Sequence, residues 1–146
     1  MKTLDEIIRA LYASVSFEAG ERPNWELQEQ IFAPEARLVR VNHAGVFEMN
    51  PRTFREGLEG MIDSGALRSF WEGEVQREVR EFAEIAQVLS AYETRTSRDG
   101  ETIDRAIKSI QLFKRDERWW ISAMIWRRPI DEDQLKAMIA AKASPK

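Results

Sequence analysis

The chain has 146 residues and a mass of 17.0 kDa, which is the usual size of one domain. We therefore predict a single domain over residues 1–146, with a core at about 3–128. Hydrophobic residues make up 43% and charged residues 32%, which is typical of a globular chain rather than a disordered one. The net charge of −3 favours neither nucleic acid nor an anionic membrane as a partner.

Several kinds of site are excluded by composition. The chain has no cysteine and a single histidine, His43, so disulfides, thiolate metal sites and multi-histidine metal sites are excluded. It has no glycine-rich phosphate loop and no metal-ligand spacing, and we expect neither a cofactor nor a metal. Because the sequence shows no apolar run of membrane-spanning length and no signal-peptide pattern, we expect a cytoplasmic protein without membrane contact.

The N-terminal part of the chain predicts three helices. Thr3 followed by Glu6 is a helix-start pattern, and apolar residues then recur at helical spacing as far as Val15. Asn24 is placed to cap a short second helix that ends by Pro34. A third helix begins at Asn50-Pro51, because asparagine caps well and proline at the first helical position has no amide to satisfy.

The remaining segments predict strands and one further helix. Two short strands, Ala36–Val41 and Gly45–Met49, precede the third helix. Four long strands follow it, and a last helix covers about 131–142; the long strands are predicted at Arg68–Glu81, Ala83–Ser97, Thr102–Arg115 and Arg118–Arg128. Helices that are segregated from an antiparallel sheet indicate the α+β class, with one bent sheet around three helices.

The turns predict which residues share a sheet face. If Asp99-Gly100 is a two-residue turn, Ser90 lies opposite Ser109, and a two-residue turn at Asp116-Glu117 places Gln111 opposite Ser122. A loop longer by one residue would reverse this assignment. The other face would be apolar and in need of cover, which predicts a homodimer through the outer sheet face; the residues behind that prediction are Leu89, Ile110, Leu112, Ile121 and Ile125.

The order of elements and four stretches of sequence resemble the nuclear transport factor 2-like superfamily, and within it the SnoaL-like polyketide cyclase group. The stretches are Phe32–Ala36, Ile85–Glu93, Ser109–Phe113 and Trp119–Trp126. The resemblance implies a cone-shaped, strongly curved, mostly antiparallel sheet wrapped around three helices, with an apolar pocket between them. It also implies a homodimer. Some members are isomerases, cyclases or dehydratases, whereas many are binding or association modules.

The resemblance further implies where an enzyme of this kind carries its chemistry. Ketosteroid isomerase-like members place a carboxylate base after the first strand, where this chain has Arg40, Asn42 and His43. On the central strand that carries a donating acid in those enzymes, this chain has Gln111. Tyr12 lies close to the position of their helix tyrosine. Without the carboxylate and the acid, the sequence argues against steroid-isomerase chemistry by that mechanism.

These considerations give a set of candidate residues, each with a structural alternative. His43 is the candidate base, or an exposed turn histidine, and Gln111 is the candidate partner of a ligand carbonyl. The serines either bind a ligand or form a ladder between strands, and the aromatic residues either line a pocket or pack in the core. The acidic run Glu72, Glu74 and Glu78 is expected to face solvent. The candidate ligand-binding residues are Tyr12, Ser90, Tyr92, Ser109, Ser122, Met124 and Trp126.

Three functions remain open at this point. The first is an apolar pocket that binds a small molecule. The second is a lyase or isomerase that transfers protons on an apolar, ring-bearing compound. The third is a dimerisation or protein-association module with a filled interior.

Overall fold

The computed structural model describes residues 1–143, and of residues 139–143 only the backbone; the last three residues of the predicted domain lie outside it. The four helices are α1 (Leu4–Val15), α2 (Trp25–Glu29), α3 (Pro51–Asp63) and α4 (Glu132–Ala143). The strands are β1 (Phe32–Asn42), β2 (Gly45–Met49), β3 (Trp71–Phe82), β4 (Ile85–Arg95), β5 (Thr102–Arg115) and β6 (Arg118–Ile130).

The starts of the first three helices follow from side chains that cap free backbone amides. Thr3 accepts a hydrogen bond from the Glu6 amide at 3.1 Å, and Asn24 accepts one from the Leu27 amide at 3.0 Å. Asn50 accepts from the Thr53 amide at 2.9 Å, and Pro51 follows it as the first helical residue. The predicted cap residues are therefore confirmed.

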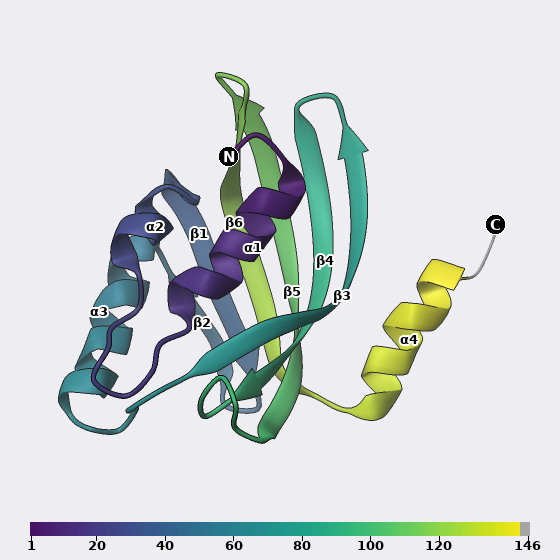
Figure 1. Cartoon of the computed structure of the whole chain (residues 1–146). Helices are drawn as coiled ribbons and strands as arrows, with labels where there is room; N and C mark the ends of the chain where they lie inside the picture. Colours follow the sequence, from purple (N-terminus) through teal and green to yellow (C-terminus); the bar gives the residue numbers. More distant parts are fainter. Residues whose placement is uncertain (144–146) are drawn as a thin grey trace.

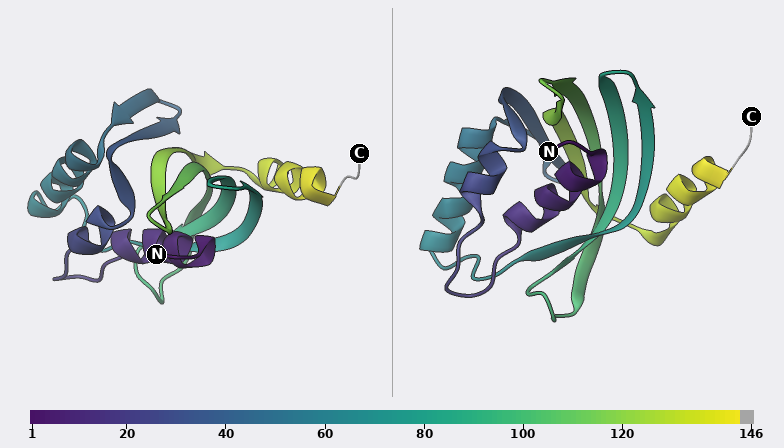
Figure 2. Two further views of the ribbon diagram at one scale, coloured as in Figure 1. Left: turned by 90° about the horizontal axis from the view of Figure 1, so that it is seen from above. Right: turned by 45° about the horizontal axis from the view of Figure 1, so that its top comes forward.

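A six-stranded sheet in the order β2-β1-β6-β5-β4-β3 forms the body of the molecule. The pairing of β1 with β6 is parallel, and the other pairings are antiparallel. The sheet curls strongly, α1 lies across its hollow, and α2 and α3 lie beside β1 and β2 (Figures 1 and 2). The main core fills the space between these helices and the sheet. The predicted α+β class and the curved sheet around three helices are confirmed.

Strand β3 bends sharply near its start. Its pairing with β4 shifts register between Glu74 and Gln76, which leaves Val75 as an extra residue in a β-bulge. The indole of Trp71 lies over Gly73, where a Cβ atom would come within 2.2 Å of the ring. Gly73 is thus required by the packing of Trp71, and the bulge beside it bends the strand.

The predicted register of β4 against β5 is wrong by one residue. Ser90 pairs with Lys108, and Leu89 pairs with Ser109. β4 ends at Arg95 and β5 begins at Thr102, so the connecting loop is longer than the predicted two-residue turn at Asp99-Gly100. Because side chains alternate between the faces, the shift reverses every inward and outward assignment on β5.

The two-residue turn between β5 and β6 is confirmed, but a bulge changes the pairs beyond it. Asp116 and Glu117 both have positive φ, at 53° and 62°, as a tight hairpin turn requires. The register then shifts between Gln111 and Leu112, so Gln111 pairs with Ala123 and not with Ser122.

Together these two shifts exchange the faces of β5 and of the first part of β6. Ile110, Leu112 and Ile121 are buried in the core, although the sequence placed them on the outer face. Ser109 and Gln111 alternate with these core residues and lie on the outer face. The burial of Ile110 and Leu112 stabilises this register over the predicted one.

The outer face therefore has a smaller apolar surface than predicted. Leu89 and Ile125 remain there, and Ile125 is 48% exposed. Helix α4 covers part of this face, because its residues Leu135 and Met138 pack against Ala91. Three of the five residues behind the homodimer prediction lie in the core. A homodimer through the outer face stays a prediction, now based on fewer residues.

Two matched substitutions test this register. We expect Ile110→Ala to lower the free energy of unfolding by about 2–5 kcal/mol, because it leaves a cavity in the core. The same change at Ile125 removes an exposed side chain, and we expect an effect within about 0.5 kcal/mol. Urea unfolding of both variants measures the difference. A larger loss at Ile125 than at Ile110 would contradict the register.

Candidate functional site

A cavity of about 360 Å³ lies between the helices and the concave face of the sheet. Most of its wall is apolar, with residues from α1, α3 and the inner faces of β1, β5 and β6. The apolar wall includes Leu11, Phe32, Leu38, Phe54, Leu58, Phe70, Tyr92, Met124 and Trp126. Four charged residues interrupt it; they are Arg40, Glu72, Lys108 and Arg128.

An ion pair between Lys108 and Glu72 is built into this wall. The Nζ atom of Lys108 donates a hydrogen bond to Oε1 of Glu72, and the two side chains are only 4% and 7% exposed. Nζ also lies 4.2 Å from the ring centroid of Tyr12 and 4.6 Å from that of Tyr92. The ammonium is thus held by one carboxylate and the faces of two aromatic rings.

Burial sets the acid–base properties of Lys108. Loss of solvent lowers the pKa of its ammonium below the usual 10.5, although the neighbouring carboxylate of Glu72 acts in the opposite direction. A cation in an apolar cavity interacts more strongly with a ligand oxygen than the same cation does in water, because the surroundings screen it less. Lys108 is therefore a fixed cation in the cavity wall to which a ligand oxygen is complementary.

A second polar chain runs beneath α1 beside this pair. Ser90 donates to Oε2 of Glu74 at 2.5 Å, so the hydroxyl of Tyr12, 2.6 Å from Ser90, is the donor to Ser90. Nε and Nη2 of Arg77 donate to the carboxylate of Glu74, and its Nη1 donates to Asp5 on α1. This chain satisfies the buried hydroxyls and fixes α1 to β3 and β4.

The charged residues other than the ion pair differ in how firmly they are held. Nε of Arg128 donates to both carboxylate oxygens of Asp104 at 3.0 Å, and its guanidinium lies 5.3 Å from the ring of Phe70. Arg40 is exposed and lies 4.8 Å from the ring of Phe47. With Lys108, three cations border the cavity, and the carboxylates of Glu72 and Asp104 pair with two of them; the positive charge that remains favours a ligand oxygen over a ligand cation.

The structure brings together some of the predicted site residues. Tyr92, Met124 and Trp126 line the cavity. Tyr12 and Ser90 are buried and point inward, but they form the polar chain beneath α1 and are not part of the cavity wall. The aromatic residues among them also pack in the hydrophobic core, so they both line the cavity and belong to the core.

The other predicted site residues lie elsewhere. Ser109 and Gln111 are on the outer face, and Gln111 is exposed. Ser122 is half-buried at the bulge, where it donates to the Gln111 carbonyl at 3.3 Å. His43 is exposed in the turn between β1 and β2 and does not border the cavity. These positions remove His43 and Gln111 as partners in one site.

The charged residues that dominate the site were not predicted as site residues from the sequence. The acidic run was expected to face solvent, yet Glu72 is buried and Glu74 is partly buried against Ser90. Lys108 was not singled out. A usable signal was present, because Lys108 alternates with Ala106, Ile110 and Leu112 and is a charge in the middle of an apolar face of β5.

Neither a metal site nor a membrane-spanning helix is found in the described part of the chain. No group of three or more histidine, aspartate or glutamate side chains among the described residues is arranged to hold a metal ion. None of the helices in this part combines the length and apolar character that crossing a bilayer requires.

Comparison with known proteins identifies the fold. No family model and no curated protein matches the chain. An NTF2-like protein of unknown function from Pseudomonas putida matches with a TM-score of 0.66 and 12% identity, over 90% of this chain and 87% of that one. An NTF2-like superfamily protein from Salmonella enterica matches with a TM-score of 0.64 and 16% identity, over 87% and 89%.

A third structure carries a suggested activity. It is a candidate ketosteroid isomerase from Shewanella frigidimarina, with a TM-score of 0.59 and 15% identity over 83% of this chain and 91% of that one. Identities this low show the fold alone. The chain therefore has the nuclear transport factor 2-like fold, as the resemblance implied, and the neighbours with this fold are mostly of unknown function.

A double-mutant cycle tests the buried ion pair. We expect Lys108→Met to lower the free energy of unfolding by about 3 kcal/mol, because it leaves the Glu72 carboxylate buried without its partner. Adding Glu72→Gln removes that charge, and we expect the double variant to recover much of the loss. Urea unfolding of the two single variants and the double variant measures the coupling. Additive losses would show that the two groups do not interact.

The two tyrosines give a second test. Tyr12 and Tyr92 are the only tyrosines in the sequence, and burial raises the pKa of both phenols above the usual value of 10.0. At pH 10.0 a free tyrosine is half ionised, whereas we expect almost no tyrosinate absorbance at 295 nm while the protein is folded. The unfolded chain loses these protons first, so stability falls as the pH rises above 10. A normal titration of either phenol in the folded protein would contradict its burial.

Proposed function

We propose that this protein binds a small, largely apolar, ring-bearing molecule in the cavity and holds a carbonyl-type oxygen of that molecule at Lys108. The observation that carries the proposal is the buried Lys108–Glu72 pair in an otherwise apolar wall. One hydrogen bond joins Nζ to Glu72, and an ammonium has three N–H groups. A ligand oxygen would take a further one.

The size and lining of the cavity support the same function. Its volume of about 360 Å³ lies within the range of about 300–1,000 Å³ that is usual for small-molecule sites. Such sites combine a mostly apolar wall with a few fixed polar groups. Here Phe54 and Trp126 contact each other edge to face, with ring centroids 6.0 Å apart, which gives a firm aromatic surface.

A neutral aromatic ketone serves as the probe. We expect 2-acetylnaphthalene to bind the wild-type protein in a saturable manner, measured by calorimetry. We expect the Glu72→Gln/Lys108→Met double variant to bind it about tenfold more weakly, because the donor to the ketone oxygen is lost. The double variant is used because it avoids the unpaired carboxylate of the single one.

The controls separate recognition of the oxygen from apolar binding. The matched hydrocarbon 2-ethylnaphthalene should bind the wild type and the double variant equally, and Lys2→Met, a change at an exposed lysine, should leave ketone binding unchanged. Equal binding of the ketone by wild type and double variant would contradict the role of Lys108. No binding of either compound would contradict the cavity as a ligand site.

A lyase or isomerase that moves a proton next to a carbonyl is the second candidate function. It is favoured by Glu72, whose carboxylate borders the cavity beside the cation that would stabilise the developing negative charge on the ligand oxygen. In this version Glu72 takes the place of His43 as the base.

Hydrogen–deuterium exchange tests this without knowledge of the natural substrate. In D₂O we expect the protein to accelerate exchange of the methyl protons of 2-acetylnaphthalene, followed by proton NMR. Glu72→Gln should return the rate to that of buffer, whereas His43→Ala should leave it unchanged. Loss of exchange in the His43 variant alone would restore the histidine as the base, and exchange at the buffer rate in the wild type would leave binding as the function.

Two predictions from the sequence are more specific than the fold. Within the fold, membership of the SnoaL-like group and a cytoplasmic location both stay predictions. An association module with a filled interior is supported less well, because the cavity is not filled by side chains.

A further inference from the structure

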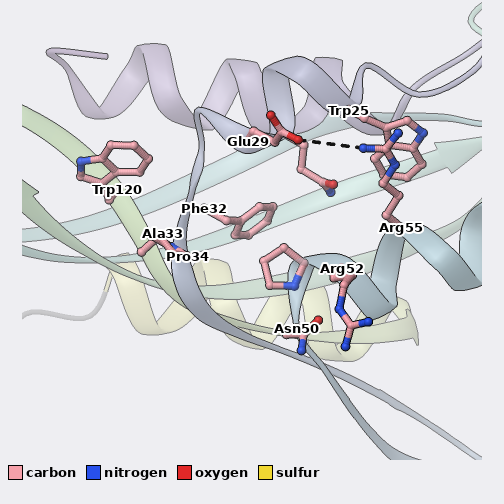
Figure 3. A pocket seen from close by; sticks show the side chains of 11 residues that line it. Trp25, Glu29, Phe32, Ala33, Pro34, Asn50, Arg52, Arg55 and Trp120 are labelled. Atoms are coloured by element: carbon pink, nitrogen blue, oxygen red, sulfur yellow. Dashed lines mark ion pairs between the residues drawn. The ribbon is translucent and has the colours of Figure 1, made fainter.

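A second hollow lies outside the cavity, between α2, the start of β1 and the start of α3. It is a cleft of about 600 Å³. Figure 3 shows Arg52 and Arg55 at one end, Trp120 at the other, and Phe32 between them. Its apolar walls are Trp25, Phe32, Ala33, Pro34, Pro51 and Trp120. The cleft thus joins an aromatic surface to a basic end.

The two arginines at the basic end form only long ion pairs with neighbouring carboxylates. Arg55 approaches Glu29 at 4.0 Å, the limit of an ion pair, and its guanidinium lies 5.3 Å from the ring of Trp25. Arg52 lies 3.4 Å from Glu56 one turn along α3. Both arginines are also in the first turns of a 13-residue helix, whose N-terminus adds partial positive charge. An anionic group is complementary to this end.

An unpaired amide in the cleft wall points independently to a ligand. Gln28 is 4% exposed, and its Nε2 atom is buried without a hydrogen-bond partner among the described residues. Its side chain lines both the cleft and the cavity. A buried donor left unpaired lowers stability, so its retention here favours a partner that is bound from outside the chain.

We propose that the cleft is a second binding site, separate from the cavity, for a ring-bearing carboxylate. Its carboxylate takes the charge of Arg52 and Arg55 and the hydrogen bond of the Gln28 amide. Its ring packs against Phe32 and Trp120. Binding in the cleft does not require a ligand in the cavity, so this proposal is independent of the function proposed above.

Two probes of equal shape test the requirement for an anion. We expect calorimetry to detect binding of 2-naphthoate and at least about tenfold weaker binding of the neutral 2-naphthamide. The Arg52→Gln/Arg55→Gln variant should weaken 2-naphthoate binding by about the same factor. Arg80→Gln/Arg115→Gln has the same net charge but changes exposed arginines elsewhere, and should bind as the wild type does.

Gln28→Leu separates a ligand donor from a structural amide. We expect it to weaken 2-naphthoate binding and to raise Tm in the absence of ligand, because it removes an unpaired polar group from the interior. Unchanged binding with a lowered Tm would show that the amide has a structural partner, which contradicts its role in the site.

Competition distinguishes the cleft from the cavity. Saturation with 2-acetylnaphthalene should leave 2-naphthoate binding unchanged, and displacement would place the carboxylate in the cavity and overturn the second site. So would the absence of saturable 2-naphthoate binding, or equal losses in the two double arginine variants. If 2-acetylnaphthalene fails to bind while 2-naphthoate binds as described, the cavity proposal alone is wrong.

Discussion

The bend of β3 is the constraint on which the rest of the interior depends. Along the sheet, Glu72 pairs with Thr94, Thr94 pairs with Asp104, and Lys108 lies four residues further along β5. On a flat sheet the backbones of Glu72 and Lys108 would be about 16 Å apart, from two strand spacings and four residues of rise. The bulge at Val75 and the curl of the sheet bring β3 over the hollow, so the two charges meet. The same curvature leaves the space that α1 and α3 close into a cavity.

The order and approximate bounds of the helices and strands follow from local signals in the sequence. Capping residues, proline and glycine act within a few residues, so Thr3, Asn24 and Asn50 mark helix starts that the structure confirms. The β2 strand was predicted with its observed bounds, Gly45–Met49. Register was not predictable from such signals, because it depends on loop length and on bulges. The loop between β4 and β5 and the bulge near Gln111 each moved a strand by one residue, and a single residue changes the face.

This error explains why the candidate site was only partly predicted. Tyr92 was placed correctly because the face of β4 does not change, and Met124 and Trp126 because the shift between β4 and β5 and the bulge between β5 and β6 cancel beyond the bulge. Ser109 and Gln111 were assigned inward only through the hairpin register, and they failed with it. Glu72 was interpreted as solvated because acidic runs in strands usually are. Its burial is a tertiary effect, since its partner Lys108 is 36 residues away in the chain.

The presence of the Lys108–Glu72 pair in this wall itself favours a functional interpretation. A buried ion pair is costly to desolvate, and well-packed apolar residues of similar volume often serve stability as well or better. The neighbouring core positions on β5, Ala106 and Ile110, show that this face accepts apolar side chains. The pair is also not sealed by packing on all sides, because both residues border an open space. A charge that stabilises the fold poorly, and that faces a cavity of ligand size, is most economically explained by what enters that cavity.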